Sequence, residues 1–381
     1  MGPQHPSTHG VLRVVLELDG ETVVKAEPVM GYLHTGIEKT MENKLYYKAL
    51  PCTDRMDYLA PMSNNLGYSM AVEKLMEIDI PERVQWIRVC LAELTRINSH
   101  LVWLGTHALD LGAMSMVLYA FRDRESILEM YEACGGQRMM SSYIRIGGLA
   151  QDIPKDFDKI CRNIIKTVRN GLRDYETLLT RNEIFINRTK NVGILTAEDA
   201  INLSLSGPLL RGSGVKHDLR KSNPYSSYEK FDFDIPVGTN GDAYDRYLVR
   251  FEEIKQSLRI IEQVLDGLPE EGPYRAHVPG VVLPPKEDVL YKMESMIFHF
   301  KIITEGFKAP VGSVYQGIES GKGEIGFFIS GDGTNKPHRV RVRPPSFINL
   351  AALPKMCEGK MFADVVCCIG SIDIVLGEVD R

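Results

Sequence analysis

The sequence has 381 residues, of which 44% are hydrophobic and 25% charged, so the chain is long enough to bury a sizeable core. The formal net charge of −5, with both signs mixed along the chain, gives no reason to expect a nucleic-acid partner. Seven cysteines without a C-x-x-C pair favour a reducing compartment and argue against an iron–sulfur cluster held by this chain alone. No apolar run is long enough to predict a membrane span, and no signal peptide is expected at the N-terminus.

The chain is predicted to begin with a loop and a β-hairpin. Two prolines keep the opening segment out of helical geometry. Residues 11–29 then alternate between apolar and polar side chains around Asp19 and Gly20, the pattern of two strands joined by a tight turn. We therefore expect residues 1–30 to form an N-terminal loop and hairpin.

Helix-length apolar spacing is predicted to dominate residues 31–305. The clearest run is 82–110, where apolar residues recur every three or four positions after Pro81. The stretch 206–243 is rich in Gly, Ser, Tyr and Asp and is predicted to be a long ordered loop. The runs with helical spacing are 37–48, 56–76, 82–110, 114–134, 155–181, 245–268 and 286–304.

The last segment, 306–381, is predicted to be β-rich, followed by a tail. Its first half combines β-forming residues with glycine turns, as in a small antiparallel sheet. The whole chain is therefore expected to be α+β, with a helical-bundle core and antiparallel β elements at both ends, in one large domain spanning 1–381.

His5 and His9 stand at the spacing of a common metal pair, but Pro6 between them makes a helix improbable. A closed zinc site would need two more ligands, and no partner cluster is visible in the sequence. Two interpretations stay open for these histidines: local hydrogen bonding within the loop, or proton donation to a bound substrate.

Two further groups of polar residues lie at helix ends. His107 and Asp110 share a helix face, so the carboxylate could orient the imidazole, although a solvated helix-end pair is the simpler interpretation. Asp54 to Tyr58 place two acids, Arg55 and a phenol at a helix start, where dipole compensation and packing are the ordinary roles. Tyr58 would also suit hydrogen bonding to a carbonyl group.

Basic residues near the predicted sheet and loop are first interpreted as solvated faces, and second as docking surfaces for another subunit. Lys322 lies in a glycine-rich string that resembles nucleotide-binding loops, but the string sits in a predicted hairpin and no helix follows it. The residues concerned are Arg211, Lys216, Arg220, Lys221, Lys322, Arg341 and Arg343.

Nine strings along the chain carry a family resemblance, and they are GPQHPSTHGVLR, GYLHTGIEKTMEN, DRMDYLAP, THALDLGAM, GQRMMSSYIRIGG, LRGSGVKHDLRK, FHFKIITEGF, RVRPPSF and IGSIDIVLGEVDR. Together they resemble the D-subunit family of bacterial NADH:quinone oxidoreductase (respiratory complex I), known in mitochondria as the 49-kilodalton subunit. The resemblance runs in order from residue 2 to residue 381. It is far more specific than any single motif above.

The resemblance implies a fold like that of the large subunit of nickel–iron hydrogenases. Those enzymes hold their metals with two paired-cysteine motifs, and the matching segments here are 55–60 and 373–378. None of the four cysteine positions holds a cysteine, so no nickel–iron site is expected. In this family, the former metal cavity is part of the quinone site.

The resemblance also assigns roles to individual residues. His9 and Tyr58 match the residues that bind the quinone headgroup, and Asp110 matches an acid that pairs with the loop histidine. A carboxylate beside a histidine is expected to raise the pKa of that histidine. Supporting roles fall on His5, Gly10 and Asp57 in the pocket and its loop, and on Arg55 and Met140 near the cluster of the neighbouring B subunit.

The resemblance implies that the chain binds no cofactor of its own. Quinone is then the substrate, and FMN, iron–sulfur clusters and NADH belong to the rest of the complex. The implied partners are the B subunit with the terminal [4Fe–4S] cluster, the C and I subunits and the membrane H subunit, with the chain peripheral on the cytoplasmic side of the membrane. The alternative is a scaffold subunit of a ferredoxin-linked, hydrogenase-related membrane oxidoreductase.

The chain departs from many family members in two of the strings above. Met139 and Met140 stand where a histidine is frequent, and Thr35 stands where an arginine is frequent. Both changes remove a group that would favour the reduced cluster, so we expect a cluster of lower potential, less dependent on pH, and a low-potential quinone such as menaquinone.

Overall fold

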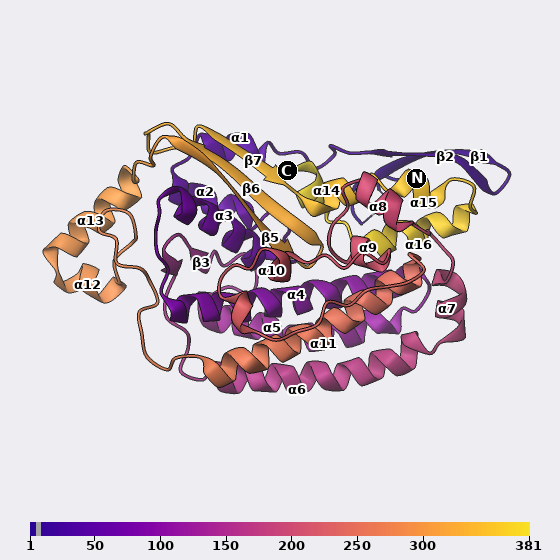
Figure 1. Cartoon of the computed structure of the whole chain (residues 1–381), viewed down its shortest axis with the longest axis horizontal. Coiled ribbons are helices and arrows are strands. Elements are labelled where there is room, and N and C mark those ends of the chain that lie inside the picture. The colour runs from indigo at the N-terminus through magenta and orange to yellow at the C-terminus, as the bar shows by residue number, and fades with distance from the viewer. Residues whose placement is uncertain (5–8) are drawn as a thin grey trace.

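The computed structural model describes residues 1–4 and 9–381, and four long helices form its central bundle (Figure 1). The bundle helix α4 packs against α5 and α11, and α6 packs against the same two helices. Apolar residues of α4 such as Val84, Ile87 and Leu91 are fully buried, as their spacing predicts. The bundle consists of α4 (Glu82–Asp110), α5 (Ser115–Gly135), α6 (Phe157–Tyr175) and α11 (Ala243–Gly267).

Helix α3 (Pro61–Leu75) lies between the bundle and a three-stranded antiparallel sheet, as Figure 1 shows. Gly67 of α3 lets the helix approach the sheet closely, because a Cβ there would lie 2.9 Å from the Phe327 ring. Strands pair in the order β5-β6-β7, with Ser320 opposite Gly323, so the first turn of the sheet has only two residues. The strands are β5 (Gly312–Ser320), β6 (Gly323–Gly331) and β7 (Arg339–Arg343).

The predicted N-terminal hairpin is confirmed. Strand β1 (Arg13–Asp19) pairs antiparallel with β2 (Thr22–Val29), and Asp19 faces Thr22 across the turn. The hairpin extends from the end of the molecule opposite α12 and α13 (Figure 1). Its buried residues join a second hydrophobic cluster built with the C-terminal helices. The expected α+β arrangement, with β elements at both ends of a helical core, is therefore observed.

Several predicted helices have different bounds from those expected. The run 37–48 forms two helices, because Leu45 is extended and packs beneath Gly306. The run 286–304 is likewise divided at Lys292, whose backbone is extended. Helix α3 begins only at Pro61, since a proline fits the first turn of a helix but not its interior. The divided helices are α1 (Ile37–Glu42), α2 (Tyr46–Thr53), α12 (Lys286–Tyr291) and α13 (Met293–Thr304).

Two regions expected to lack helices contain short ones. The stretch 206–243 holds three helical turns, and the tail after β7 is helical rather than irregular. The run 155–181 ends in a π-helical turn, Glu176–Thr180. The remaining elements are β3 (Ile144–Arg145), β4 (Gly148–Leu149), α7 (Glu183–Thr189), α8 (Ala197–Asn202), α9 (Gly207–Gly212), α10 (Leu219–Ser222), the 3₁₀ turn Tyr228–Lys230, α14 (Pro345–Leu350), α15 (Leu353–Cys357), α16 (Phe362–Ile372) and α17 (Leu376–Asp380).

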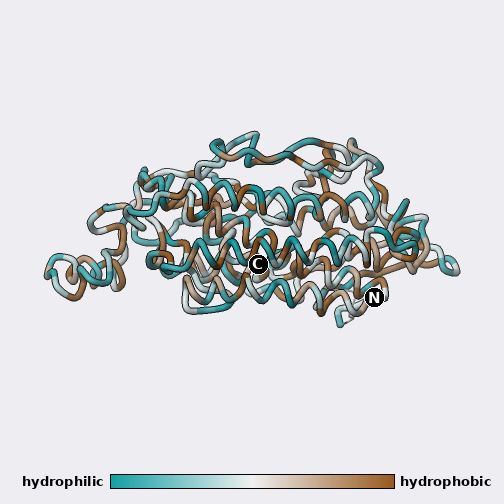
Figure 2. Tube along the Cα trace, turned by 90° about the horizontal axis from the view of Figure 1, so that it is seen from below, coloured by the Kyte–Doolittle hydropathy of each residue, from teal (hydrophilic) through white to brown (hydrophobic). Residues whose placement is uncertain are grey.

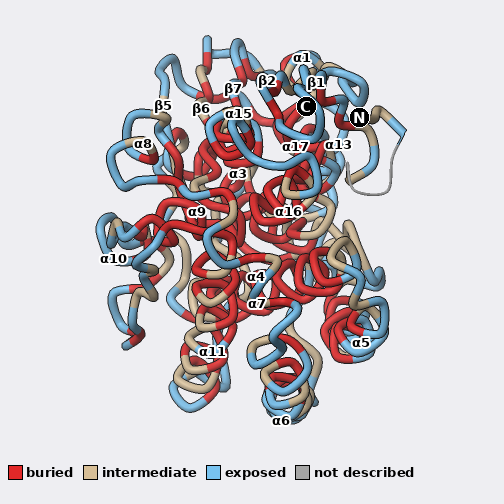
Figure 3. The backbone as a smooth tube through the Cα atoms, turned by 90° about the vertical axis from the view of Figure 1, so that its right-hand side faces the viewer, coloured by how far each residue is buried: buried red, intermediate tan, exposed pale blue. Residues whose placement is uncertain are grey.

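Helices α12 and α13 form an arm that projects from the body (Figures 1 and 2). The arm contrasts with the interior, where buried residues concentrate between the bundle and the sheet (Figure 3). Of the described residues of α13, only Ile302 is buried. An apolar stripe along α13 is exposed, and it consists of Met293, Met296, Ile297, Phe300 and Ile303.

Among the described residues, no helix is both long and apolar enough to cross a membrane. All seven cysteines are free thiols, and all but Cys52 are buried. This burial fits the expectation that the thiols pack as small apolar groups.

Candidate functional site

A cavity of about 680 Å³ opens beside the C-terminal half of α4. Four segments distant in sequence meet there: the N-terminal loop, the turn before α3, α4 itself and the residues after α16. His9, Tyr58 and Asp110, the three residues expected to act together, all line it. The other lining residues are Gly10, Leu59, Val102, Trp103, Thr106, Leu109, Asp373, Ile374 and Val375.

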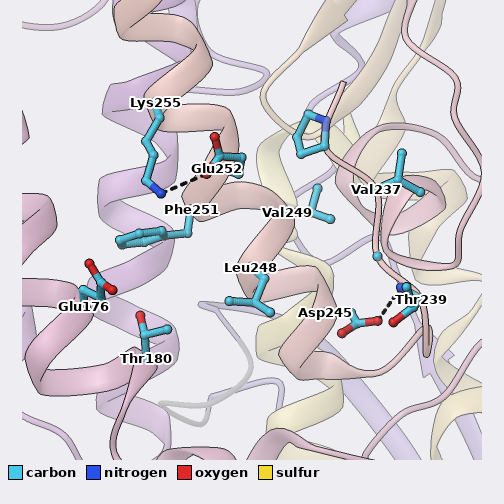
Figure 4. A pocket seen from close by; sticks show the side chains of 12 residues that line it. Glu176, Thr180, Val237, Thr239, Asp245, Leu248, Val249, Phe251, Glu252 and Lys255 are labelled. Atoms are coloured by element: carbon cyan, nitrogen blue, oxygen red, sulfur yellow. Dashed lines mark hydrogen bonds and ion pairs between the residues drawn. The ribbon is translucent and has the colours of Figure 1, made fainter. Parts of the chain in front are cut away.

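A separate cavity of about 580 Å³ lies between α11, the π-helical turn and residues 236–239 (Figure 4). Its charged side chains have partners close by: Lys255 lies 2.9 Å from Glu252, and Asp245 accepts the backbone N–H of Thr239 at 2.7 Å. The polar groups of this cavity are thus already engaged, and it contains no predicted site residue. We therefore locate the candidate site in the first cavity.

His9 reaches the cavity from a sharply turned loop. Its own φ is 51°, and Gly10 follows with a φ of 117°, a conformation that favours glycine. The His9 Nε2 atom is buried without a hydrogen-bond partner among the described residues, and lies 3.7 Å from Asp110 Oδ2. His5 lies outside the described residues, so its supporting role stays a prediction.

Burial, rather than the attraction between His9 and Asp110, determines how their pKa values shift. Burial raises the pKa of Asp110 to about 6. Burial also lowers the pKa of His9, although the negative charge of Asp373 opposes that effect. The prediction that Asp110 raises the pKa of His9 is therefore wrong, because the lost hydration of the imidazolium outweighs the attraction of nearby carboxylates.

Tyr58 and Asp57 lie in the turn before α3. Asp57 Oδ1 accepts the N–H of Leu59 at 3.1 Å, which fixes this turn, and its Oδ2 lies 3.3 Å from Lys322 Nζ. Burial is the main cause that raises the pKa of Tyr58. The phenol is therefore a neutral hydrogen-bond donor at the cavity wall.

Lys322 was expected to lie on a solvated face, and this expectation is wrong because the residue is buried. The side chain is 1% exposed and occupies the two-residue turn between β5 and β6. Its Nζ donates to Ser99 Oγ at 2.6 Å and lies 3.8 Å from Asp373 Oδ2. One lysine thus bridges Asp57 and Asp373, and burial without these carboxylates would disfavour its charge. Arg211 and Arg220 of the predicted basic cluster are buried as well.

The segments 55–60 and 373–378, which occupy the places of the two cysteine motifs, lie against each other. A Cβ at Gly377 would lie 2.6 Å from the Met56 carbonyl oxygen, so only glycine permits this approach. Burial, followed by the nearby Asp57, raises the pKa of Glu378 to about 8. Among the described residues, no group of three or more His, Cys, Asp or Glu side chains is arranged to hold a metal.

Arg55 and Met140 belong to segments that contact one another. Ser142 Oγ donates to Asp54 Oδ2 at 2.5 Å and ties the two together. Arg55 is exposed and donates to the Pro51 carbonyl at 2.8 Å, and Met140 is half-buried. Their nearness to a cluster held by another subunit stays a prediction.

His107 does not pair with Asp110 as one interpretation suggested. The ring is buried, and neither of its nitrogens has a hydrogen-bond partner among the described residues. Sequence reasoning omitted Lys322, Asp373 and Trp103 from the site. Only the match of Asp373 to a metal-binding motif of hydrogenases offered a signal for any of them.

Comparison with known families identifies the family of this chain. A family model described as "Respiratory-chain NADH dehydrogenase, 49 Kd subunit" matches residues 110–381. The chain belongs to this family.

Full-length relatives are similar to this member of the 49-kilodalton family. The D subunit of NADH-quinone oxidoreductase from Geotalea uraniireducens is 56% identical over 100% of this chain and 97% of its own length. The D subunit numbered 2 of NADH-quinone oxidoreductase from Koribacter versatilis is 58% identical, with 100% and 95% covered. The correspondingly numbered protein from Chloroflexus aurantiacus is 56% identical, with 100% and 93% covered.

Proposed function

We propose that this chain forms the quinone-headgroup pocket of an H⁺-translocating NADH:quinone oxidoreductase. The observation that carries the proposal is one cavity lined by His9, Tyr58 and Asp110, in which His9 Nε2 is buried without a partner among the described residues. A buried polar atom without a partner is costly unless a ligand uses it. The names of the relatives, which specify a quinone oxidoreductase, support the same substrate.

The reaction reduces a quinone to a quinol with two electrons and two protons. The Tyr58 hydroxyl donates a hydrogen bond to one quinone carbonyl, and His9 donates to the other. Negative charge arriving on the headgroup raises the proton affinity of groups around it, including Asp110. The turned backbone at Gly10 brings His9 to the cavity, where it can reach the headgroup.

Electrons reach the quinone from NADH through FMN and iron–sulfur clusters in other subunits of the complex. The last donor is the [4Fe–4S] cluster of the B subunit, on the side of Arg55 and Met140. The chain itself supplies no cofactor, and it lies peripherally on the cytoplasmic side with the C, I and H subunits as neighbours. Met139, Met140 and Thr35 favour a cluster of low potential and a quinone such as menaquinone.

Tyr58→Phe tests the proposal, because it removes only the phenolic hydroxyl. We expect quinone reduction by the assembled complex to fall at least about tenfold. Oxidation of NADH by ferricyanide, which takes electrons before the quinone, should stay unchanged. Tyr291→Phe is the matched control, since Tyr291 on α12 is 86% exposed. Equal turnover in the two variants would contradict a quinone site here and favour a scaffold role.

A further inference from the structure

Behind Trp103 in the wall of the cavity lies a buried histidine that the proposed function does not use. His107 lies one turn before Asp110 on α4 and is 1% exposed. Both ring nitrogens are without a hydrogen-bond partner among the described residues. Such groups destabilise a fold, so their presence beside a site needs an explanation.

Packing fixes the plane of this imidazole. Trp103 stacks on it with ring centroids 5.3 Å apart and planes 15° apart, and Phe185 meets it edge-on at 6.1 Å. Trp103 is itself held, because its Nε1 donates to the Gly370 carbonyl at 2.7 Å and the Arg250 guanidinium lies 4.4 Å from its ring centroid. The ring therefore has little freedom to seek a partner elsewhere.

Gly370 of α16 lets His107 approach it closely, and Asp110 lies near the same point. A Cβ added there would lie 2.5 Å from His107 Nδ1 and 3.5 Å from Asp110 Oδ2. The backbone of Gly370 is ordinary helix, so glycine provides room here rather than an unusual dihedral. The same Oδ2 atom lies 3.7 Å from His9 Nε2. The carboxyl group thus stands between an imidazole on the loop and an imidazole behind the cavity wall.

We propose that His107 is a positioning residue for Asp110: when Asp110 takes up a proton from solvent, its carboxyl group turns from His9 and donates a hydrogen bond to the bare nitrogen of His107. The inference rests on the proposed function for its role in turnover, because it gives the carboxyl group two defined positions while quinone is reduced.

The charge state of His107 suits this role. Burial lowers its pKa to about 3, and Arg250, His9 and Arg246 act in the same direction. These are the charged or titratable groups that face it from α11 and the loop. The ring is therefore neutral and keeps one nitrogen free to accept. The pKa of Asp110 near 6 makes its protonated form accessible close to neutral pH.

The test compares His107→Phe with His107→Gln in the purified complex. Phenylalanine keeps a ring against Trp103 but removes the acceptor, whereas glutamine keeps a carbonyl oxygen that can accept. The carboxyl C=O band would be followed by infrared spectroscopy during a pH titration, and Asp110→Asn would identify the band of Asp110.

In His107→Phe we expect the pKa of Asp110 to fall by about one unit, a tenfold loss in proton affinity. The C=O band of the protonated group should move to higher frequency because its hydroxyl loses a partner. His107→Gln should restore both values. An unchanged band and pKa in His107→Phe would overturn the proposal, as would an effect that His107→Gln does not rescue, because that would indicate ring packing alone.

Gly370→Ala gives a second route, should His107→Phe prevent assembly. The added methyl group would lie 2.5 Å from His107 Nδ1 and would displace the ring, so the pKa of Asp110 should again fall, and no change would overturn the proposal. The titration is made without quinone. It therefore keeps its meaning even where Tyr58→Phe leaves quinone reduction unchanged, which is the result that would overturn the proposed function alone.

Discussion

Buried polar residues have hydrogen-bond partners in the middle of α4 but largely lack them at its C-terminal end. In the middle, Glu93 accepts hydrogen bonds from Tyr228 and Ser257 at 2.6 Å each, and from Arg220 at 3.1 Å. At the end, Asp110 lies 3.7 Å from its nearest ionic partner and His107 has no hydrogen-bond partner among the described residues. Both regions belong to one helix and both exclude most water.

The difference distinguishes a structural network from a site. When a buried charge makes all of its hydrogen bonds, these bonds offset much of the cost of removing it from water. Replacing one of its partners would therefore only weaken the network. Polar atoms left unpaired beside a cavity keep their bonding capacity for a ligand or for one another. The region around Glu93, which we call the paired region, holds α4 in place. The region around His107 and Asp110, which we call the unpaired region, can still form hydrogen bonds with a ligand.

The largest effect is expected from breaking the paired region. Glu93→Ala leaves Arg220 and Arg96 without their shared carboxylate in the core, and should lower the free energy of unfolding by about 3–5 kcal/mol. The thermal unfolding midpoint measures this loss. Glu129→Ala, an exposed position on α5, is the control and should change little. Similar midpoints in the two variants would contradict the structural role of the network.

A smaller loss is expected at Lys322, which bridges Asp57 and Asp373 beside the cavity. Lys322→Met removes the charge that Asp57 and Asp373 share, so Asp57 loses its cation and Asp373 keeps only Arg250, 4.0 Å away. Stability should fall by about 2–4 kcal/mol, and quinone reduction should fall with it. Lys308→Met, which changes an exposed lysine, tests whether the effect belongs to the site. A loss of stability without a loss of turnover would contradict a role of Lys322 in the quinone pocket.

The smallest effect has the opposite sign. The pKa of Asp110 is raised in the folded state, so burial of its ionised form destabilises the protein above pH 6, and this cost disappears as pH falls toward 4. Asp110→Asn should therefore be more stable than the parent at pH 8, by roughly 1–2 kcal/mol, and no more stable at pH 4. Unfolding at both pH values measures the difference.

The same change of pH should affect the middle of α4 in the opposite direction. The pKa of Glu93 is lowered in the folded state, because the nearby arginines outweigh its burial, so its contribution to stability is present above pH 5 and is lost on acidification. Acidification should therefore remove the stabilising contribution of Glu93 and also the destabilising cost of ionised Asp110. A stability gain in Asp110→Asn that is equal at both pH values would show that ionisation is not the cause.

Much of the fold follows from local patterns in the sequence. Helix α4 has the predicted bounds, because a long amphipathic run with a proline at its start leaves few alternatives. The two hairpin-forming regions are also confirmed, since Gly turns between β-forming runs act locally. The breaks at Leu45 and Lys292 could not be predicted, because no proline or glycine marks them and packing decides them.

The site could be predicted only in part. The family resemblance led to His9, Tyr58 and Asp110, which do share one cavity. Lys322 could not be found, because nothing in a single sequence shows that a lysine in a hairpin turn meets two acids that are far from it along the chain. The wrong direction for the pKa of His9 has the same origin, since burial is a tertiary property.

The arm formed by α12 and α13 affects how the chain behaves when it is produced without neighbours. Its apolar stripe is exposed to water, and Phe298 of the same helix is exposed as well. Exposed apolar patches promote self-association, so the chain expressed alone should form oligomers through this arm. Co-expression with the rest of the assembly is then the practical route to material in which the pocket can be studied.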